Sequence, residues 1–281
     1  MTIARGEGRP LEGAGLSRGA FERVRSLLQE RAGIRLTEAK YEMVSSRLGR
    51  RLRALGLHSY DAYLELVQAE DGPENEHFLN ALTTNLTSFF REAHHFRHLQ
   101  EVWLPEVLAS GRSTIRIWSA GCSSGEEPYS IAMALLDRLP RDVRLSILAT
   151  DLDSDVLARA RSGVYPADRI RKLPADTARR WFQRGSGPHA GLVRVRPELS
   201  ERISFRRLNL FEPWPMKKKV DAIFCRNVLI YFDKETQRPL VERFADQLVE
   251  RGTLFIGHSE TLFRLTERYE SLGNTIYRRL S

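Results

Sequence analysis

The sequence predicts an α/β protein with a mostly parallel sheet, preceded by a helical N-terminal region. Three observations support this prediction. The chain has 281 residues, which suits one large or two small domains. Residues 21–83 give only helical patterns. From Ser113 onward, short apolar segments alternate with longer segments of helical periodicity, as in a parallel sheet covered by helices.

The helical region is expected to form a domain over residues 18–92. Residues 1–17 are rich in glycine, and we expect them to be disordered. Thr37 and Ser59 are suitable N-caps for two of the helices. The expected helices cover residues 21–32, 37–55, 59–69 and 74–83, and a connection at 86–91 follows.

The second domain is expected over residues 93–281, beginning with a helix at 93–110. Ser154 is a suitable N-cap for one of its later helices. Expected strands are 115–119, 145–149, 220–225 and 253–257, and expected helices are 127–139, 154–162 and 234–248.

The alternation of strands and helices is interrupted at about residues 164–207. Residues 192–196 alternate apolar and basic side chains, as a half-buried antiparallel strand does, and residues 203–205 resemble another strand. We therefore expect a small antiparallel β insertion on the side of the α/β domain.

Bulk properties favour a cytoplasmic protein. No apolar run is long enough to span a bilayer, and residues 1–18 lack the apolar core of a secretory signal. The two cysteines, Cys122 and Cys225, lie in apolar strand contexts without the spacing of a zinc site. They are expected to be reduced thiols rather than part of a disulfide framework.

The net charge of +8 is unevenly distributed along the chain. Residues 1–60 carry a net charge of +6, residues 61–110 carry −7, and residues 161–219 carry +10. Two basic regions of this kind would attract an acidic partner, whether a nucleic acid, a membrane surface or an acidic protein. Many of the individual charges could equally be solvated helix faces.

A nucleoside site is predicted where the first strand meets its helix. The turn contains Gly121 and Gly125, and the second strand ends at Asp151, a residue type that binds ribose hydroxyls. The turn lacks a complete G-x-G-x-x-G motif, and Glu126 and Glu127 would repel a pyrophosphate at the helix start. A cofactor without phosphates, S-adenosylmethionine, therefore fits better.

Five segments in this order resemble the chemotaxis receptor methyltransferases, the CheR family. They are residues 83–92 (TTNLTSFFRE), 119–129 (SAGCSSGEEPY), 149–153 (ATDLD), 224–232 (FCRNVLIYF) and 257–260 (GHSE). The resemblance runs from about residue 18 to the C-terminus. It implies a helical domain, a doubly wound S-adenosylmethionine-binding domain and an inserted β subdomain. The implied reaction is methyl transfer to the side-chain carboxylate of receptor glutamates, which serves receptor adaptation in chemotaxis.

The resemblance also implies roles for individual residues. Arg91 and Tyr231 would be catalytic, with Arg226 close to the transferred methyl group. Glu126 would face the amino-acid part of the cofactor, and Asp151 would bind the ribose. The implied cofactor-binding residues are Asn85, Thr87, Arg91, Glu126, Asp151, Asn209, Leu210, Arg226 and Asn227.

The chemistry of the implied reaction agrees with the residues present. A glutamate has a reference pKa of about 4.3, so the attacking carboxylate is already ionised and needs no general base. The enzyme must instead align carboxylate, methyl carbon and sulfur. We expect Arg91 to orient a carboxylate, either of the cofactor or of the substrate.

A basic helix face is expected to dock the receptor. Lys40, Arg47, Arg50 and Arg51 lie at spacings that share one side of the helix at 37–55. Receptor methylation regions are long, glutamate-rich helices, so this face would attract them. In some members of the family the β subdomain also binds a tethering peptide at the receptor C-terminus, and the sequence does not decide this point.

Two other functions are alternatives to this interpretation. A nucleic-acid methyltransferase would use the net positive charge, but residues 227–230 (NVLI) lack the Pro-Pro-aromatic turn of adenine methylases. An inactive binding module would not need the full set of cofactor residues. We expect no nucleic-acid partner, a monomer, and no metal, although His94, His95 and His98 resemble a metal cluster.

Overall fold

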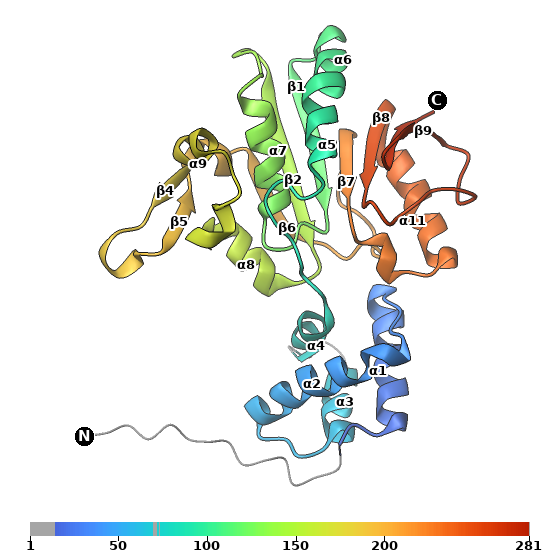
Figure 1. The fold of residues 1–281 in the computed structure, drawn as a ribbon. Coiled ribbons are helices and arrows are strands. Elements are labelled where there is room, and N and C mark those ends of the chain that lie inside the picture. Colours follow the sequence, from blue (N-terminus) through green and yellow to red (C-terminus); the bar gives the residue numbers. More distant parts are fainter. Residues whose placement is uncertain (1–14, 70–71, 73, 281) are drawn as a thin grey trace. The chain divides into compact units, whose positions relative to one another are not determined.

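A computed structural model describes residues 15–69, 72 and 74–280 of the chain (Figure 1). The expected disorder of residues 1–17 falls largely outside the described residues. The chain divides into two compact units, Met1–Thr83 and Thr84–Ser281. The division falls earlier than the expected boundary at residue 92, because residues 84–92 belong to the second unit.

The first unit is all-helical. Its core contains Phe21, Leu28, Leu48 and Tyr63, which are buried on facing helices. Ser17 and Ser59 act as N-caps, accepting hydrogen bonds from backbone amides in the first turns of their helices. The helices are α1 (Arg18–Ala32), α2 (Tyr41–Leu55), α3 (Tyr60–Gln68) and α4 (Glu74–Leu82), with a 3-10 turn, η1 (Glu38–Lys40), before α2.

The second unit contains a seven-stranded sheet with the order β6-β2-β1-β7-β8-β10-β9. The pairs β6–β2, β2–β1, β1–β7 and β7–β8 are parallel, whereas β10 is antiparallel to both β8 and β9. The strands are β1 (Thr114–Ala120), β2 (Arg144–Asp151), β6 (Ile203–Arg207), β7 (Val220–Cys225), β8 (Leu248–Ile256), β9 (Tyr269–Gly273) and β10 (Ile276–Arg279). The mostly parallel sheet confirms the predicted fold class.

Helices cover both faces of this sheet. On one face, Phe96 stacks on Phe224 of β7. On the other face, Trp118 of β1 packs against Phe244 of the last helix. The helices are α5 (Ala93–His98), continued by a π-helical turn, η2 (Leu99–Trp103), and by α6 (Leu104–Ala109), then α7 (Glu126–Leu136), α8 (Ser154–Ser162) and α11 (Lys234–Gln247). The unit is therefore doubly wound.

The insertion is smaller than expected. Its sheet has the order β3-β5-β4, formed by β3 (Val164–Pro166), β4 (Phe182–Arg184) and β5 (Leu192–Val195), and both pairs are antiparallel. The remaining insertion elements are η3 (Ala167–Ile170), α9 (Ala175–Trp181), η4 (Gly187–His189) and α10 (Pro197–Ser200).

One expected insertion strand belongs elsewhere. Residues 203–205 lie in β6, which pairs with β2 of the main sheet through the register Ile147↔Ile203. Placing them in the insertion was therefore wrong. Buried Ile203 and Phe205 extend the main core, and a short alternating pattern does not reveal which strand it will pair with.

Across residues 15–69, 72 and 74–280, no helix has both the length and the apolar character required to cross a membrane.

Candidate functional site

Polar side chains gather at the carboxyl ends of β1, β2 and β7. This is where the order of the parallel strands reverses, the usual position of ligand sites in such sheets. Residues 84–92 lie against this edge. Asn85 Nδ2 donates to Asp153 at 2.7 Å, Ser123 Oγ donates to the Asn85 carbonyl at 3.2 Å, and the Phe90 amide donates to Ser130 Oγ at 2.9 Å. Segments distant in sequence thus form one surface.

The backbone of this edge is unusually strained. Four non-glycine residues adopt left-handed conformations there, which cost about 1–3 kcal/mol each. They are Phe90 (φ 52°), Glu92 (φ 57°), Ser123 (φ 49°) and Asn227 (φ 59°). Such strain concentrates at functional sites, where the surrounding contacts hold the backbone in place.

The glycines of the β1–α7 turn are required by the protein's own packing. Gly121 has φ 86°, and a Cβ there would lie 2.4 Å from the Val228 side chain. Gly125 has φ 95°, and a Cβ there would lie 2.9 Å from Ala160. The turn thus packs closely against the loop after β7 and against α8. The close approach to a ligand that the sequence suggested stays a prediction.

Asp151 is the last residue of β2, and its carboxylate is held by backbone amides. It accepts hydrogen bonds from the amides of Ser123 at 2.7 Å and Asp153 at 3.0 Å. Burial raises the pKa of Asp151 to about 6, although these amides oppose the shift. The N-cap of α8 is Asp153 rather than the expected Ser154, because Asp153 accepts from the amides of Asp155 and Val156.

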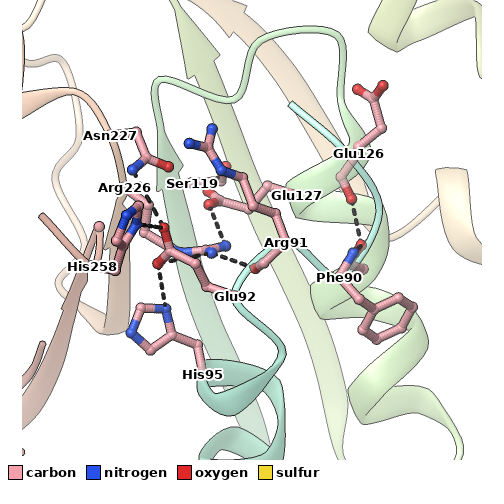
Figure 2. A network of polar contacts seen from close by, with 12 residues as sticks. Phe90, Arg91, Glu92, His95, Ser119, Glu126, Glu127, Arg226, Asn227 and His258 are labelled. Atoms are coloured by element: carbon pink, nitrogen blue, oxygen red, sulfur yellow. Dashed lines mark hydrogen bonds and ion pairs between the residues drawn. The ribbon is translucent and has the colours of Figure 1, made fainter. Parts of the chain in front are cut away.

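A buried ion cluster lies beside this edge (Figure 2). Arg226 contacts Glu92 at 3.2 Å and Glu127 at 3.2 Å, and it also donates to the Arg91 carbonyl. Ser119 Oγ donates to Glu127 at 2.7 Å. Only 3% of the Arg226 side chain is exposed, so its charge is neutralised within the protein.

Two further side chains hold Glu92 from the opposite side. His258 Nδ1 lies 2.8 Å from Glu92 Oε1, and Asn227 Nδ2 donates to the same oxygen at 3.3 Å. Burial alone would raise the pKa of Glu92, but its bonds to His258 and Arg226 lower that pKa to about 2. Burial raises the pKa of Glu127 despite Arg226. Of the two carboxyl groups that contact Arg226, Glu92 is therefore the more firmly ionised, and Glu127 is the less firmly ionised.

The histidine-rich helix start shows one potential ligand cluster. Glu92, His94 and His95 place ligand atoms within 4.8 Å of one another. Arg226 already lies 3.2 Å from the Glu92 carboxylate, and burial together with Arg226 lowers the pKa of His95 to about 3. The positive charge facing this carboxylate thus comes from an arginine, and the arrangement is that of an ion-pair network.

Arg226 has anionic surroundings. The family resemblance implies that its guanidinium lies near the transferred methyl group, and the structure shows this guanidinium buried between Glu92 and Glu127. Its neighbour Asn227 projects to Glu92, and the turn that carries both is fixed by buried Glu260. The Glu260 carboxylate accepts from the amides of Asn227, Ile230 and Gly257.

Glu126 and Thr87 share a single cationic partner. Arg169 of η3 forms an ion pair with Glu126 and donates to the Thr87 carbonyl at 2.8 Å. Ser124 Oγ donates to the other Glu126 oxygen at 2.7 Å. Figure 2 shows the Glu126 side chain pointing away from the Arg226 cluster. Arg169 is not among the residues predicted from the sequence, because nothing in its neighbourhood follows a recognised motif.

The remaining predicted residues also lie along this edge. Arg91 donates to the Leu86 carbonyl at 2.8 Å, and the Tyr231 hydroxyl donates to the Thr84 carbonyl at 3.3 Å. Asn209 and Leu210 follow β6, whose end is tied to β2 by the Leu208 amide and the Asp151 carbonyl. Asn209 Oδ1 accepts from the Phe211 amide at 3.1 Å, which shapes this loop.

The predicted docking face is divided by the structure. Arg47 donates to the carbonyl oxygens of Ala81 and Thr83, and Arg51 binds Glu74 through two bonds of 2.6 and 2.7 Å. These two arginines therefore tie α2 to α4 and the chain after it. Lys40 and Arg50 are exposed.

Sequence comparisons match the division of the chain into a helical unit and a unit built on the sheet. Residues 19–83 match the family described as "CheR methyltransferase, all-alpha domain", and residues 85–278 match "CheR methyltransferase, SAM binding domain". The chain is 46% identical to the chemotaxis protein methyltransferase of Salmonella typhimurium, covering 93% of this chain and 90% of that protein. It is 47% identical to chemotaxis protein methyltransferase 2 of Pseudomonas aeruginosa, covering 92% and 91% respectively.

Proposed function

This chain belongs to the CheR methyltransferase family, and on that premise we propose that it methylates glutamate side chains of chemoreceptors. The methyl donor is S-adenosylmethionine, and the products are a glutamyl γ-methyl ester and S-adenosylhomocysteine. The observation that carries the proposal is the polar edge at β1, β2 and β7, which residues 84–92 help to form.

The residues at this edge fit the chemistry of the cofactor. Asp151 is ionised above about pH 6, and a carboxylate offers about four acceptor sites, so the backbone amides of Ser123, Leu152 and Asp153 leave capacity for a ribose hydroxyl. Glu126 would hold the ammonium group of the amino-acid part, with Asn85 and Thr87 nearby. Asn209 and Leu210 would flank the adenine. When bound, the cofactor supplies an electrophilic methyl group on a sulfonium.

The catalytic contribution of the chain would be orientation and water exclusion. A receptor glutamate is ionised at neutral pH, so it can attack without a general base. Arg91 would orient a carboxylate, and Tyr231, which hydrogen-bonds the Thr84 carbonyl, would position the reacting groups. Arg226, being buried, acts as a positioning residue that fixes Arg91 and Asn227 through the cluster it shares with Glu92.

Receptor docking would involve the exposed part of the basic face on the helical unit. Lys40 and Arg50 remain available to attract a glutamate-rich helix, whereas Arg47 and Arg51 support the unit itself. We propose that the enzyme works as a monomer in the cytoplasm, where receptor signalling helices lie.

A tethering peptide at the β insertion is a further part of this proposal. The insertion contains a cavity of about 900 Å³. Its lining combines apolar Ile170, Leu173 and Phe182 with several arginines, which suits an acidic peptide with apolar side chains. Calorimetric titration of a receptor C-terminal peptide into the full chain should give saturable binding, and its absence would remove this part of the proposal.

Methyl transfer to a receptor fragment tests the function. Labelled S-adenosylmethionine is incubated with a glutamate-rich receptor cytoplasmic fragment, and the product is treated with alkali. A carboxyl methyl ester releases its label as methanol. A label that withstands alkali, or that enters nucleic acid instead, would contradict the proposal. Arg91→Ala should lower turnover at saturating cofactor, and full turnover would exclude a catalytic role for this residue.

A further inference from the structure

The guanidinium of Arg169 covers two groups that the proposed function assigns to the cofactor. It forms an ion pair with Glu126 and donates to the carbonyl of Thr87 at 2.8 Å. Only 1% of the Glu126 side chain is exposed, compared with 36% of the Arg169 side chain. A ligand can reach the Glu126 carboxylate only if a neighbouring group moves.

The cofactor's ammonium group seeks the same acceptors. Like a guanidinium, an ammonium is a cation that donates several hydrogen bonds, and a carboxylate beside a backbone carbonyl suits both. Ser124 Oγ also donates to the second oxygen of Glu126 at 2.7 Å, which reduces the acceptor capacity left on this carboxylate. Two cations within a few ångströms of one carboxylate repel each other strongly in a partly buried site.

Of the three residues in this contact, Glu126, Thr87 and Arg169, the side chain of Arg169 can move most readily. Glu126 lies in the first turn of α7, where Ser130 Oγ donates to its carbonyl at 2.6 Å. Thr87 belongs to the segment anchored through Asn85. Arg169, by contrast, projects from the short 3-10 turn η3, and its long side chain can rotate into solvent.

We propose that Arg169 is an affinity-determining residue of the cofactor site, whose guanidinium holds the ammonium position until the cofactor displaces it. This inference rests on the proposed function. It makes the β insertion, through η3, a contributor to cofactor affinity. Ligands that carry the ammonium must displace the guanidinium, and ligands without it need not.

Isothermal titration of two ligands into the full chain tests this inference. S-adenosylhomocysteine carries the ammonium, whereas 5′-methylthioadenosine shares the nucleoside and sulfur but lacks the amino-acid part. Arg169→Gln should bind S-adenosylhomocysteine about three- to tenfold more tightly than the unaltered chain. Affinity for 5′-methylthioadenosine should stay the same. Lys172→Gln, which removes an exposed charge near η3, should change neither affinity.

Three results would count against this inference. Unchanged or weaker binding of S-adenosylhomocysteine by Arg169→Gln would mean that Arg169 does not compete with the cofactor's ammonium group. An equal gain for both ligands would mean that the substitution opens the cleft in general. If the unaltered chain bound neither ligand, the proposed function itself would fail, and this inference with it.

Discussion

Replacing Glu92 by glutamine should destabilise the second unit by about 3 kcal/mol at pH 7. The pKa of Glu92 falls from its usual 4.5 to about 2 because His258 and Arg226 outweigh the effect of burial. Each unit of pKa corresponds to about 1.4 kcal/mol, and 9% exposure of the side chain leaves little solvent screening. Glutamine keeps the size of the side chain but leaves the buried Arg226 with one anion fewer.

The dependence on pH makes this prediction specific. Because the pKa is lower in the folded protein, the stabilisation is complete well above pH 4.5 and is lost as the pH falls toward 2. The difference between Glu92→Gln and the unaltered chain should therefore shrink by about 1.4 kcal/mol on going from pH 7 to pH 3.5.

Urea unfolding followed by tryptophan fluorescence measures this difference, since all four tryptophans lie in the second unit. Glu101→Gln, which removes an exposed carboxylate from the same helical stretch, is the matched control and should cost less than about 0.5 kcal/mol. A cost below 1 kcal/mol for Glu92→Gln, or a cost that does not change with pH, would refute the reasoning.

Three other predictions concern the cofactor edge and the docking face. Affinity for S-adenosylhomocysteine should fall as the pH drops through about 6, because Asp151 becomes protonated, and calorimetry on Asp151→Asn should show weaker, pH-independent binding. Gly121→Ala should lower the free energy of unfolding in urea by about 2–4 kcal/mol, because of backbone strain and contact with Val228. Adding Val228→Ala should restore part of this stability. Full stability of Gly121→Ala alone would contradict the prediction. Arg50→Glu should raise the KM for receptor without changing cofactor affinity, because Arg50 is exposed. Arg51→Glu should mainly lower the thermal stability of the helical unit, because Arg51 binds Glu74. Equal effects of the two substitutions on KM would contradict this difference between Arg50 and Arg51.

The sequence predicted the parallel sheet because the sheet depends on local patterns. Strand, turn and helix succeed one another around Gly121, and an acidic residue ends the second strand, so periodicity and spacing were sufficient for the fold. The cofactor-binding roles assigned to this edge stay predictions. The assignment of residues 203–205 failed because the pairing of a short strand with β2 depends on the tertiary structure. The last two strands, β9 and β10, were missed because their segments lack strict alternation.

The ionic contacts of the site were the least predictable part. Glu92 and Arg226 are far apart in sequence, and nothing in either segment indicates that they form one buried cluster. The same applies to Arg51 and Glu74, a pair in which a predicted docking residue binds a carboxylate of its own unit. Charged residues at helical spacing indicate a shared face, but their partners come from other elements.

Mapping the modified residue tests the central claim most directly. The full chain is incubated with S-adenosylmethionine and a receptor cytoplasmic fragment, and the products are analysed by peptide mass spectrometry under mildly acidic conditions that preserve esters. The account predicts a methyl group on glutamate side-chain carboxylates of the receptor helices, and its loss after alkali. Methylation of another side chain, or of no receptor residue while the chain binds S-adenosylhomocysteine, would contradict it.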